Sequence, residues 1–212
     1  MRYLRQSYSS YCYSLSSIKK NKLKKMKWQE FVGKHNGEKM IVVGLSPESV
    51  YNALGTGHRT IGVNDVQRYI PCDYTVVIDP KECFTEERWS YIINSKSRAI
   101  FSQLVIDHPR VVPIKLNEER GSYLTSSDVI DISYTSTFVA CNIAYSMGAK
   151  KIGITGQDHT DIKHSLNNKI EGILKHLSEL KGSLSKKGVE LVSLSANSRI
   201  NEVLKFEDAA EF

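Results

Sequence analysis

The sequence has no apolar run of about 20 residues, the length that a helix needs to cross a bilayer. It has four cysteines, none of them in a C-x-x-C pair, and no apolar signal-peptide core. These absences exclude a membrane-spanning helix and argue against a zinc ribbon or a secreted disulfide scaffold. We therefore expect reduced thiols and a cytoplasmic protein, with peripheral attachment to a membrane left open.

The two most specific phosphate-binding motifs are also missing. The sequence contains neither the dinucleotide fingerprint G-x-G-x-x-G nor the P-loop pattern that ends in Gly-Lys-Ser/Thr. A strand that breaks at a single glycine and enters a helix still presents backbone N–H groups to an anion. Any nucleotide site in this chain is therefore expected at such a strand end.

Acidic residues are absent from residues 1–29, which hold eight basic side chains. Subtracting these eight from the 29 Lys and Arg leaves 21, against 23 Asp and Glu, so the rest has a net charge of −2. We expect a basic tail at 1–27 and one globular domain at 28–212. The tail has three interpretations: a solvated, partly disordered segment, a basic surface helix for an anionic membrane or nucleic acid, or an arm that packs on the rest of the same chain. Translation from Met26 is a further alternative.

Short apolar runs alternate with amphipathic segments along the rest of the chain. They predict strands at 40–44, 60–63, 74–78, 98–101, 110–116, 152–156 and 189–194, and helices at 84–95, 135–147 and 165–187. This alternation predicts an α/β fold, a Rossmann-like doubly wound and mostly parallel sheet with helices on both faces. Residues 117–133 are polar and weakly periodic, and they predict a lid, an acceptor-side loop or a disordered excursion. The acidic end at 206–212 is expected to fray.

Polar residues follow several of these strands. Gly44 and the loop through Ser46 and Pro47 follow the first, Asn64 the second and Asp79 the third. Ligands of open α/β sheets bind beyond the carboxyl ends of the strands. The alternative at each position is an ordinary turn whose polar groups satisfy the local backbone.

Five segments resemble, in their order, a superfamily that includes bacterial sialyltransferases, flagellin-linked motility accessory factors and archaeal hydroxymethylpterin diphosphokinases. The segments are GLSPES, VND, VIDP, YTSTFVACNIAYSMGAKKIGITGQD and ELVSLSANSRINEV. The resemblance covers about residues 40–206. It implies a nucleotide-binding fold and transfer of a sugar from a nucleotide to an acceptor hydroxyl.

The resemblance also implies positions for nucleotide contacts. Residues 44–48 correspond to the superfamily's G-x-G-P-S loop, which holds the nucleotide phosphates; this chain has Leu45, Ser46 and Glu48 where relatives carry Asn, Gly and Ser. Thr137 stands where relatives usually have glycine. Positions that match nucleotide-contacting residues, or the T-S and G-x-D motifs, are Asn64, Thr135, Ser136, Asp158, Asn197 and Ser198.

Catalytic candidates follow the G-x-D motif, where the sialyltransferases use a histidine as general base. His159 and His164 are the two local histidines, and a neutral imidazole can accept an acceptor's hydroxyl proton. Asp158 is a third catalytic candidate. If the reaction is instead pyrophosphoryl transfer from a nucleoside triphosphate, Mg²⁺ is required, and Asp79, Asp158 and Asp161 are candidate oxygen ligands.

Three functions therefore remain open from the sequence. The chain is a nucleotide-sugar-dependent, sialyltransferase-like glycosyltransferase, a Mg²⁺-dependent pyrophosphoryl transferase, or an inactive binding or assembly protein that keeps the fold. The implied partners are a nucleotide or nucleotide sugar, an unknown acceptor and, through the tail, an anionic membrane, nucleic acid or another protein. A homo-oligomer is a further alternative.

Overall fold

The structure is a computed structural model of the 212-residue chain that describes residues 25–121, 124, 128–160 and 169–212. Its centre is a sheet of eight parallel strands in the order β10-β9-β8-β1-β2-β3-β4-β5. The strands are β1 (Lys39–Val43), β2 (Arg59–Val63), β3 (Tyr74–Val76), β4 (Ala99–Ser102), β5 (Val111–Pro113), β8 (Lys151–Thr155), β9 (Glu190–Ser193) and β10 (Lys205–Phe206). The predicted α/β fold with a parallel sheet is therefore confirmed.

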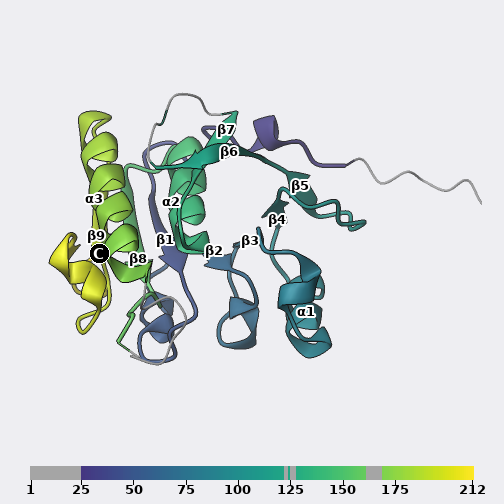
Figure 1. Cartoon of the computed structure of the whole chain (residues 1–212), viewed down its shortest axis with the longest axis horizontal. Helices are drawn as coiled ribbons and strands as arrows, with labels where there is room; N and C mark the ends of the chain where they lie inside the picture. The colour runs from purple at the N-terminus through teal and green to yellow at the C-terminus, as the bar shows by residue number, and fades with distance from the viewer. Residues whose placement is uncertain (1–24, 122–123, 125–127, 161–168) are drawn as a thin grey trace, which may run out of the picture.

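Helices cover both faces of this sheet (Figure 1). The helices α2 (Ser136–Ser146) and α3 (Ile170–Lys186) pack on the face that carries Val42 and Ile154. The opposite face carries Val43 and Ile100, because adjacent strand residues point to opposite sides. It is covered by α1 (Glu86–Ile93) and by the short 3₁₀ helices η2 (Val50–Ala53) and η3 (Val66–Arg68). This is the doubly wound arrangement that the alternating pattern predicts.

The helix α2 is buried on every side from Thr137 to Ala144. It lies between the sheet and the neighbouring elements α3 and β7, which accounts for its continuous run of apolar and small residues. Another 3₁₀ helix, η1 (Trp28–Glu30), brings Trp28 and Phe31 into the same core, where both rings pack edge-on against Phe101. The globular part of the fold therefore includes residues just after the basic segment.

Residues 117–133 differ from the expected loop or disordered excursion. Lys115–Arg120 form β6 and Val129–Ile132 form β7, which pair in parallel as a separate two-stranded sheet. Ile130 and Asp131 of β7 are buried, and Asn117 donates a hydrogen bond of 3.2 Å to the Asp131 carboxylate. Polar residues fill these strands because only part of the small sheet faces the core, so the alternation in the sequence is weak.

The end of the described chain also differs from the expected frayed segment. Lys205 and Phe206 form β10 beside β9, and the ring of Phe212 is buried against Gly153 of β8. Lys39 and Lys151 lie 5.6 and 5.2 Å from the centre of that ring. This short acidic sequence thus packs through Phe212, whereas Phe206 at its other end is exposed, and local composition does not reveal which ring is buried.

The other 3₁₀ helices among the described residues are η4 (Lys81–Cys83), after β3, and η6 (Arg199–Glu202), after β9. Pro113 lies in the edge strand β5, as its missing N–H predicts. No helix among the described residues combines the length and hydrophobicity that a membrane span requires. The basic segment 1–24 and residues 165–168 of the predicted long helix lie outside the described residues.

Strands β1 and β8 lie at the point where the winding direction changes. From β1 the chain adds β2, β3, β4 and β5 on one side, and from β8 it adds β9 and β10 on the other. Two glycines follow these central strands: a Cβ on Gly44 would overlap the carbonyl oxygen of Gly156, and Gly156 has φ +69°. The two loops therefore touch backbone to backbone, which only glycine allows.

We predict that Gly44→Ala destabilises the fold by about 2–3 kcal/mol, the cost of forcing a methyl group into a filled site. The matched control is Gly182→Ala in α3, where the added Cβ meets no atom within 4 Å. That control should instead gain up to about 1 kcal/mol from helix propensity. Urea unfolding followed by circular dichroism measures both. Equal stabilities of Gly44→Ala and wild type would contradict the tight contact between the loops.

Candidate site at the carboxyl edge of the sheet

The candidate residues lie along one edge of the sheet. Strands β9, β8, β1, β2 and β3 are consecutive neighbours, and each is followed at its carboxyl end by at least one predicted site residue. Adjacent strands are about 4.8 Å apart, so this row spans about 19 Å. In the order of the strands, the residues are Asn197, Asp158, Gly44, Asn64 and Asp79. The row is centred on the change of winding direction, where open α/β sheets bind ligands.

A buried serine joins the two central loops. The Oγ atom of Ser49 lies 2.6 and 2.7 Å from the carboxylate oxygens of Asp158, so its single hydrogen is donated to one of them. The same Oγ accepts a hydrogen bond of 3.0 Å from the N–H of Gly156, and Thr155 Oγ1 donates to the carbonyl of Ser49. Ser46 Oγ accepts the Asp158 N–H at 3.0 Å. We call Ser46, Ser49, Gly156 and Asp158 the loop junction.

The carboxyl group of Asp158 is only 4% exposed. Burial raises its pKa above the ordinary range, and the negative charge of Glu48 acts in the same direction. Hydrogen bonds from Ser49 and Ser195 oppose this shift without cancelling it. The oxygens of Asp158 already accept hydrogen bonds from hydroxyl groups, so Asp158 holds the two loops together. A direct contact between Asp158 and a ligand remains a prediction.

The side chain of Asn64 contains a hydrogen-bond acceptor that has no partner. Its φ of +51° is left-handed, a conformation that asparagine adopts more readily than most side chains. Its N–H binds the carbonyl of Val76 at 2.8 Å, and its Nδ2 donates to Asp79 at 3.4 Å. The Oδ1 atom is buried and has no hydrogen-bond partner. An acceptor in this state favours a ligand hydroxyl or amine as its partner.

Asp65, the residue after Asn64, is fully buried and anchors α1. Arg88 binds its carboxylate through two hydrogen bonds of 2.9 and 2.6 Å, and Arg68 lies 3.2 Å from it. Burial alone would raise the pKa of Asp65, but the hydrogen bond and charge of Arg88 and the charge of Arg68 hold it below its usual value. Both arginines at this part of the edge are therefore engaged by a carboxylate.

The start of α2 reaches the same edge through its polar residues. Thr135 caps the helix by accepting the N–H of Phe138, and Thr137 donates from its hydroxyl to Gln157 Oε1. Gln157 Nε2 in turn lies 3.1 Å from Nε2 of His159. Ser136, the first residue of α2, is partly exposed beside this group. The T-S motif is therefore connected to the residues around the G-x-D motif.

The Asn197-Ser198 pair separates into an exposed and a buried residue. Asn197 is exposed, whereas Ser198 Oγ donates to the carbonyl of Gln157 at 2.8 Å and caps η6. Asn201 Nδ2 holds the loop by donating to the carbonyls of Ser195 and Ala196. Ser198 therefore orients the loop, while Asn197 remains accessible. In the same row, Pro47 is exposed and Ser46 is partly exposed.

No group of three or more His, Cys, Asp or Glu residues suited to a metal ion occurs within the described ranges. Asp79 and Asp158 follow strands three positions apart in the sheet, a spacing of about 14 Å, too large for one ion bound at about 2.1 Å. Asp161 and His164 lie outside the described residues. The described carboxylates therefore offer no pair for the predicted Mg²⁺ site.

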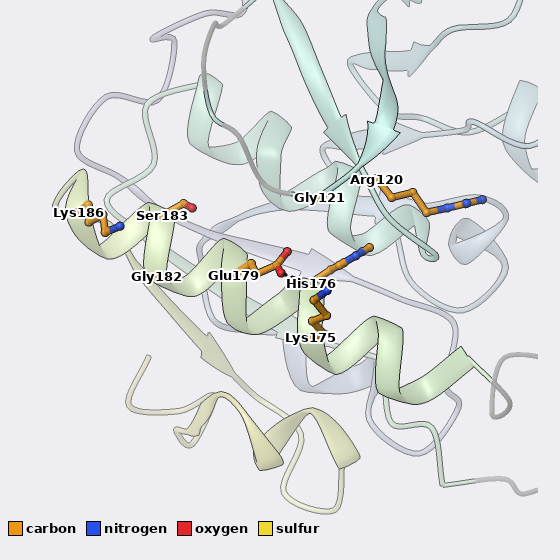
Figure 2. A pocket seen from close by; sticks show the side chains of 8 residues that line it. All are labelled: Arg120, Gly121, Lys175, His176, Glu179, Gly182, Ser183 and Lys186. Atoms are coloured by element: carbon orange, nitrogen blue, oxygen red, sulfur yellow. Dashed lines mark ion pairs between the residues drawn. The ribbon is translucent and has the colours of Figure 1, made fainter.

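A hollow of about 590 Å³ lies elsewhere, between α3 and the end of β6 (Figure 2). None of the described candidate residues lines it; its walls are Arg120, Gly121, Lys175, His176, Glu179, Gly182, Ser183 and Lys186. His176 bonds to Ser133 at 2.8 Å and stacks on Tyr134, so it supports the residues that lead into α2. Its pKa is lowered mainly by burial.

Sequence reasoning missed Ser49, Gln157 and Thr137 as members of this site. Ser49 is the last residue of the quoted GLSPES segment, and Gln157 stands within the G-x-D motif, so their place within these motifs was the only available signal. Their partners lie 20 to 109 positions away along the chain. Long-range hydrogen bonds of this kind leave no periodic pattern in a sequence.

A parallel sheet whose connections run in opposite directions from its two central strands defines a Rossmann-like α/β fold. Among solved structures, the sialyltransferase CstII of Campylobacter jejuni with cytidine-5′-monophosphate has a TM-score of 0.50 to this chain at 14% identity, covering 82% of this chain and 87% of that one. CST-II with a trisaccharide acceptor and CMP scores 0.53 at 14% identity, covering 82% and 88%.

The monofunctional α-2,3-sialyltransferase Cst-I of the same organism scores 0.51 at 12% identity, covering 83% of this chain and 82% of that one. No protein-family model and no curated protein matches the sequence. Likeness at these identities shows the fold, and the chain therefore has the fold of the Campylobacter sialyltransferases. The resemblance drawn from the five sequence segments is confirmed at that level.

We predict that Ser49→Ala lowers the free energy of unfolding by about 1–3 kcal/mol, because it leaves the buried N–H of Gly156 without a partner and removes one of the hydroxyls that bind the buried Asp158 carboxyl. The matched control, Ser90→Ala, removes an exposed hydroxyl in α1 and should change stability by less than about 0.5 kcal/mol. Chemical denaturation measures both variants. A loss as small as that of the control would mean that Ser49 does not connect the loops.

The raised pKa of Asp158 also predicts a pH dependence. A carboxyl whose folded pKa exceeds its unfolded value stabilises the fold fully below the unfolded pKa, and this contribution is lost as pH rises through the folded pKa. The stability of Asp158→Asn relative to wild type should therefore improve between about pH 4 and pH 7. Urea unfolding across that range, with exposed Asp107→Asn as control, checks the sign. A relative loss for Asp158→Asn would contradict it.

Proposed function

We propose that the protein is a nucleotide-sugar-dependent glycosyltransferase of the sialyltransferase type. The main supporting observation is the unpartnered Oδ1 of Asn64, placed one strand from the change of winding direction. A buried acceptor without a partner is costly, and a ribose hydroxyl or an exocyclic amine would satisfy it. Solved structures with this fold bind CMP and a trisaccharide acceptor, which supports the same ligand classes here.

The donor phosphate would lie between the Gly44–Pro47 loop and the first turn of α2. Ser136 begins this helix, whose amino end favours an anion. The ribose and base would extend toward Asn64 and Asn197. In this arrangement Asp158 and Ser198 act by positioning the loops, because their polar atoms already bond within the protein.

The reaction would transfer one glycosyl group. A base removes the proton of the acceptor hydroxyl as its oxygen bonds to the anomeric carbon, and the bond between that carbon and the phosphate oxygen breaks. The nucleotide leaves as a nucleoside monophosphate. His159 at this edge and His164 beyond the described residues are the histidines available near the G-x-D motif.

We expect CMP to raise the melting temperature, because a ligand that binds only the folded state stabilises it by about 2.7 kcal/mol at 100 times its Kd. Thermal-shift measurements with CMP, UMP, AMP and the corresponding triphosphates, each with and without Mg²⁺, distinguish the candidates. Stabilisation only by a triphosphate with Mg²⁺ would support pyrophosphoryl transfer. The absence of any nucleotide response would support a binding or assembly protein.

Asn64→Asp should weaken CMP binding at least about tenfold, equivalent to about 1.4 kcal/mol. The change replaces a neutral amide by a carboxylate beside Asp79 while keeping the side-chain shape. The matched control is Asn94→Asp, at the carboxyl end of α1 and so at the opposite edge of the sheet. Isothermal titration calorimetry measures both affinities. Equal affinities for the two variants would remove Asn64 from the nucleotide site.

A further inference from the structure

A chain of side-chain hydrogen bonds leads from α2 to His159. Thr135 Oγ1 and Thr137 Oγ1 are 2.9 Å apart, Thr137 bonds to Gln157 Oε1, and Gln157 Nε2 lies 3.1 Å from His159 Nε2. Thr137 and Gln157 are buried, and His159 is partly exposed at the edge. The chain therefore ends on one of the two histidines considered as general base.

The direction of these bonds determines which imidazole nitrogen carries hydrogen. With its carbonyl oxygen toward the hydroxyl of Thr137, the Gln157 amide presents its nitrogen to His159. An amide nitrogen only donates hydrogen bonds, so the facing Nε2 of His159 must be the unprotonated acceptor. In a neutral imidazole the hydrogen is then on Nδ1.

We propose that Gln157, held by Thr137, is a positioning residue that keeps His159 in the Nδ1–H tautomer and prevents it from acting as the general base. The lone pair of Nε2 is engaged by the amide, and Nδ1 already carries a hydrogen, so neither nitrogen can accept the acceptor's proton in this arrangement. This role rests on the proposed glycosyl transfer. The base must then come from another group.

The backbone at His159 also indicates a fixed orientation. Its φ is +54°, a left-handed conformation that most side chains avoid. The neighbouring loop holds it, because the carbonyls of Gln157 and Asp158 accept hydrogen bonds from Ser198 Oγ and Arg199 N. Both the ring and its backbone are therefore constrained by contacts from α2 and from the loop after β9.

Thr137 supplies the hydroxyl that faces the carbonyl oxygen of the Gln157 amide. Thr137 contacts Gln157 across 20 positions of the chain. We therefore expect the fixed imidazole to depend on this one threonine as much as on Gln157.

The tautomer is tested by ¹⁵N NMR of the histidine-labelled protein without nucleotide, at about pH 8, where an ordinary imidazole is neutral. The His159 signals are assigned by their absence in His159→Asn. We expect Nδ1 protonated in wild type. In Gln157→Glu, a carboxylate acceptor faces Nε2, and that nitrogen should become protonated. Wild-type Nε2–H, or no change in Gln157→Glu, would overturn the proposal.

Thr137→Val is a second variant that keeps the buried shape while removing the hydroxyl. The freed Gln157 amide can then present either its oxygen or its nitrogen to His159, so the tautomer preference should weaken. The control is Thr56→Val, on the opposite side of the sheet, which should leave the His159 signals unchanged. An unchanged preference in Thr137→Val would show that Thr137 does not orient the amide.

Turnover provides an independent test with His159→Asn. Asparagine tolerates left-handed φ and keeps an N–H donor near the position of Nδ1, but it cannot accept a proton. With CMP-sialic acid as donor, release of CMP should stay within about tenfold of wild type, whereas loss of a general base costs about 10²–10⁴-fold. A loss of that size would overturn the proposal.

Failure of the proposed glycosyl transfer and failure of the positioning role of Gln157 give different results. If wild type neither binds CMP nor releases it from CMP-sialic acid, the proposed glycosyl transfer with this donor fails. The ¹⁵N measurement needs no ligand, so the tautomer and its dependence on Gln157 and Thr137 are still decided. If CMP is released but the tautomer is Nε2–H, only the positioning role fails.

Discussion

The contact between Gly44 and Gly156 sets the geometry of the whole edge. Strands β1 and β8 lie side by side in register along their length, and their loops can follow different directions only if the two backbones pass each other at touching distance. Ser49 then ties the loop after β1 to the loop after β8 through Gly156 and Asp158. The row of candidate residues is arranged around this one crowded point.

Among the described residues, the charged side chains at this edge are mainly acidic, and the nearby arginines are paired with a carboxylate. Asp158 is buried with its carboxylate on Ser49, Glu48 is exposed on the same loop, and Asp79 follows β3. The two arginines that follow β2 and begin α1 both bind Asp65. An anionic ligand here would rely on hydroxyls, amides and the first turn of α2, since the nearby guanidinium groups already have a partner.

Much of the fold follows from patterns visible in the sequence, and much of the site does not. Apolar runs that end in Gly44, Asn64 and Asp79 identify strand ends, and parallel strands place those ends on one edge. The contacts of Ser49 with Asp158 and of Phe212 with Gly153 join positions 109 and 59 residues apart. Their residue types would suit exposed loops equally well, so only the folded arrangement reveals them.

Two of the residues that differ from the pattern the sequence resembles, Ser46 and Thr137, form hydrogen bonds within the candidate site. Ser46 stands where relatives have glycine, and its hydroxyl accepts the N–H of Asp158. Thr137 also replaces a glycine, and its hydroxyl binds Gln157. Each substitution fills space that bare backbone would leave open and engages a polar group that a ligand could otherwise contact.

The same substitutions change how a nucleotide could be held. A loop of glycines binds phosphate through its backbone N–H groups, but here the N–H groups of Ser46 and Asp158 are bonded to Gly156 and to the Ser46 hydroxyl. A nucleotide would therefore rely on the first turn of α2 and on side chains that still have hydrogen-bonding capacity, such as Asn64 through its Oδ1 atom. A site of this kind would recognise ribose or base hydrogen-bond donors more strongly than it recognises phosphate charge.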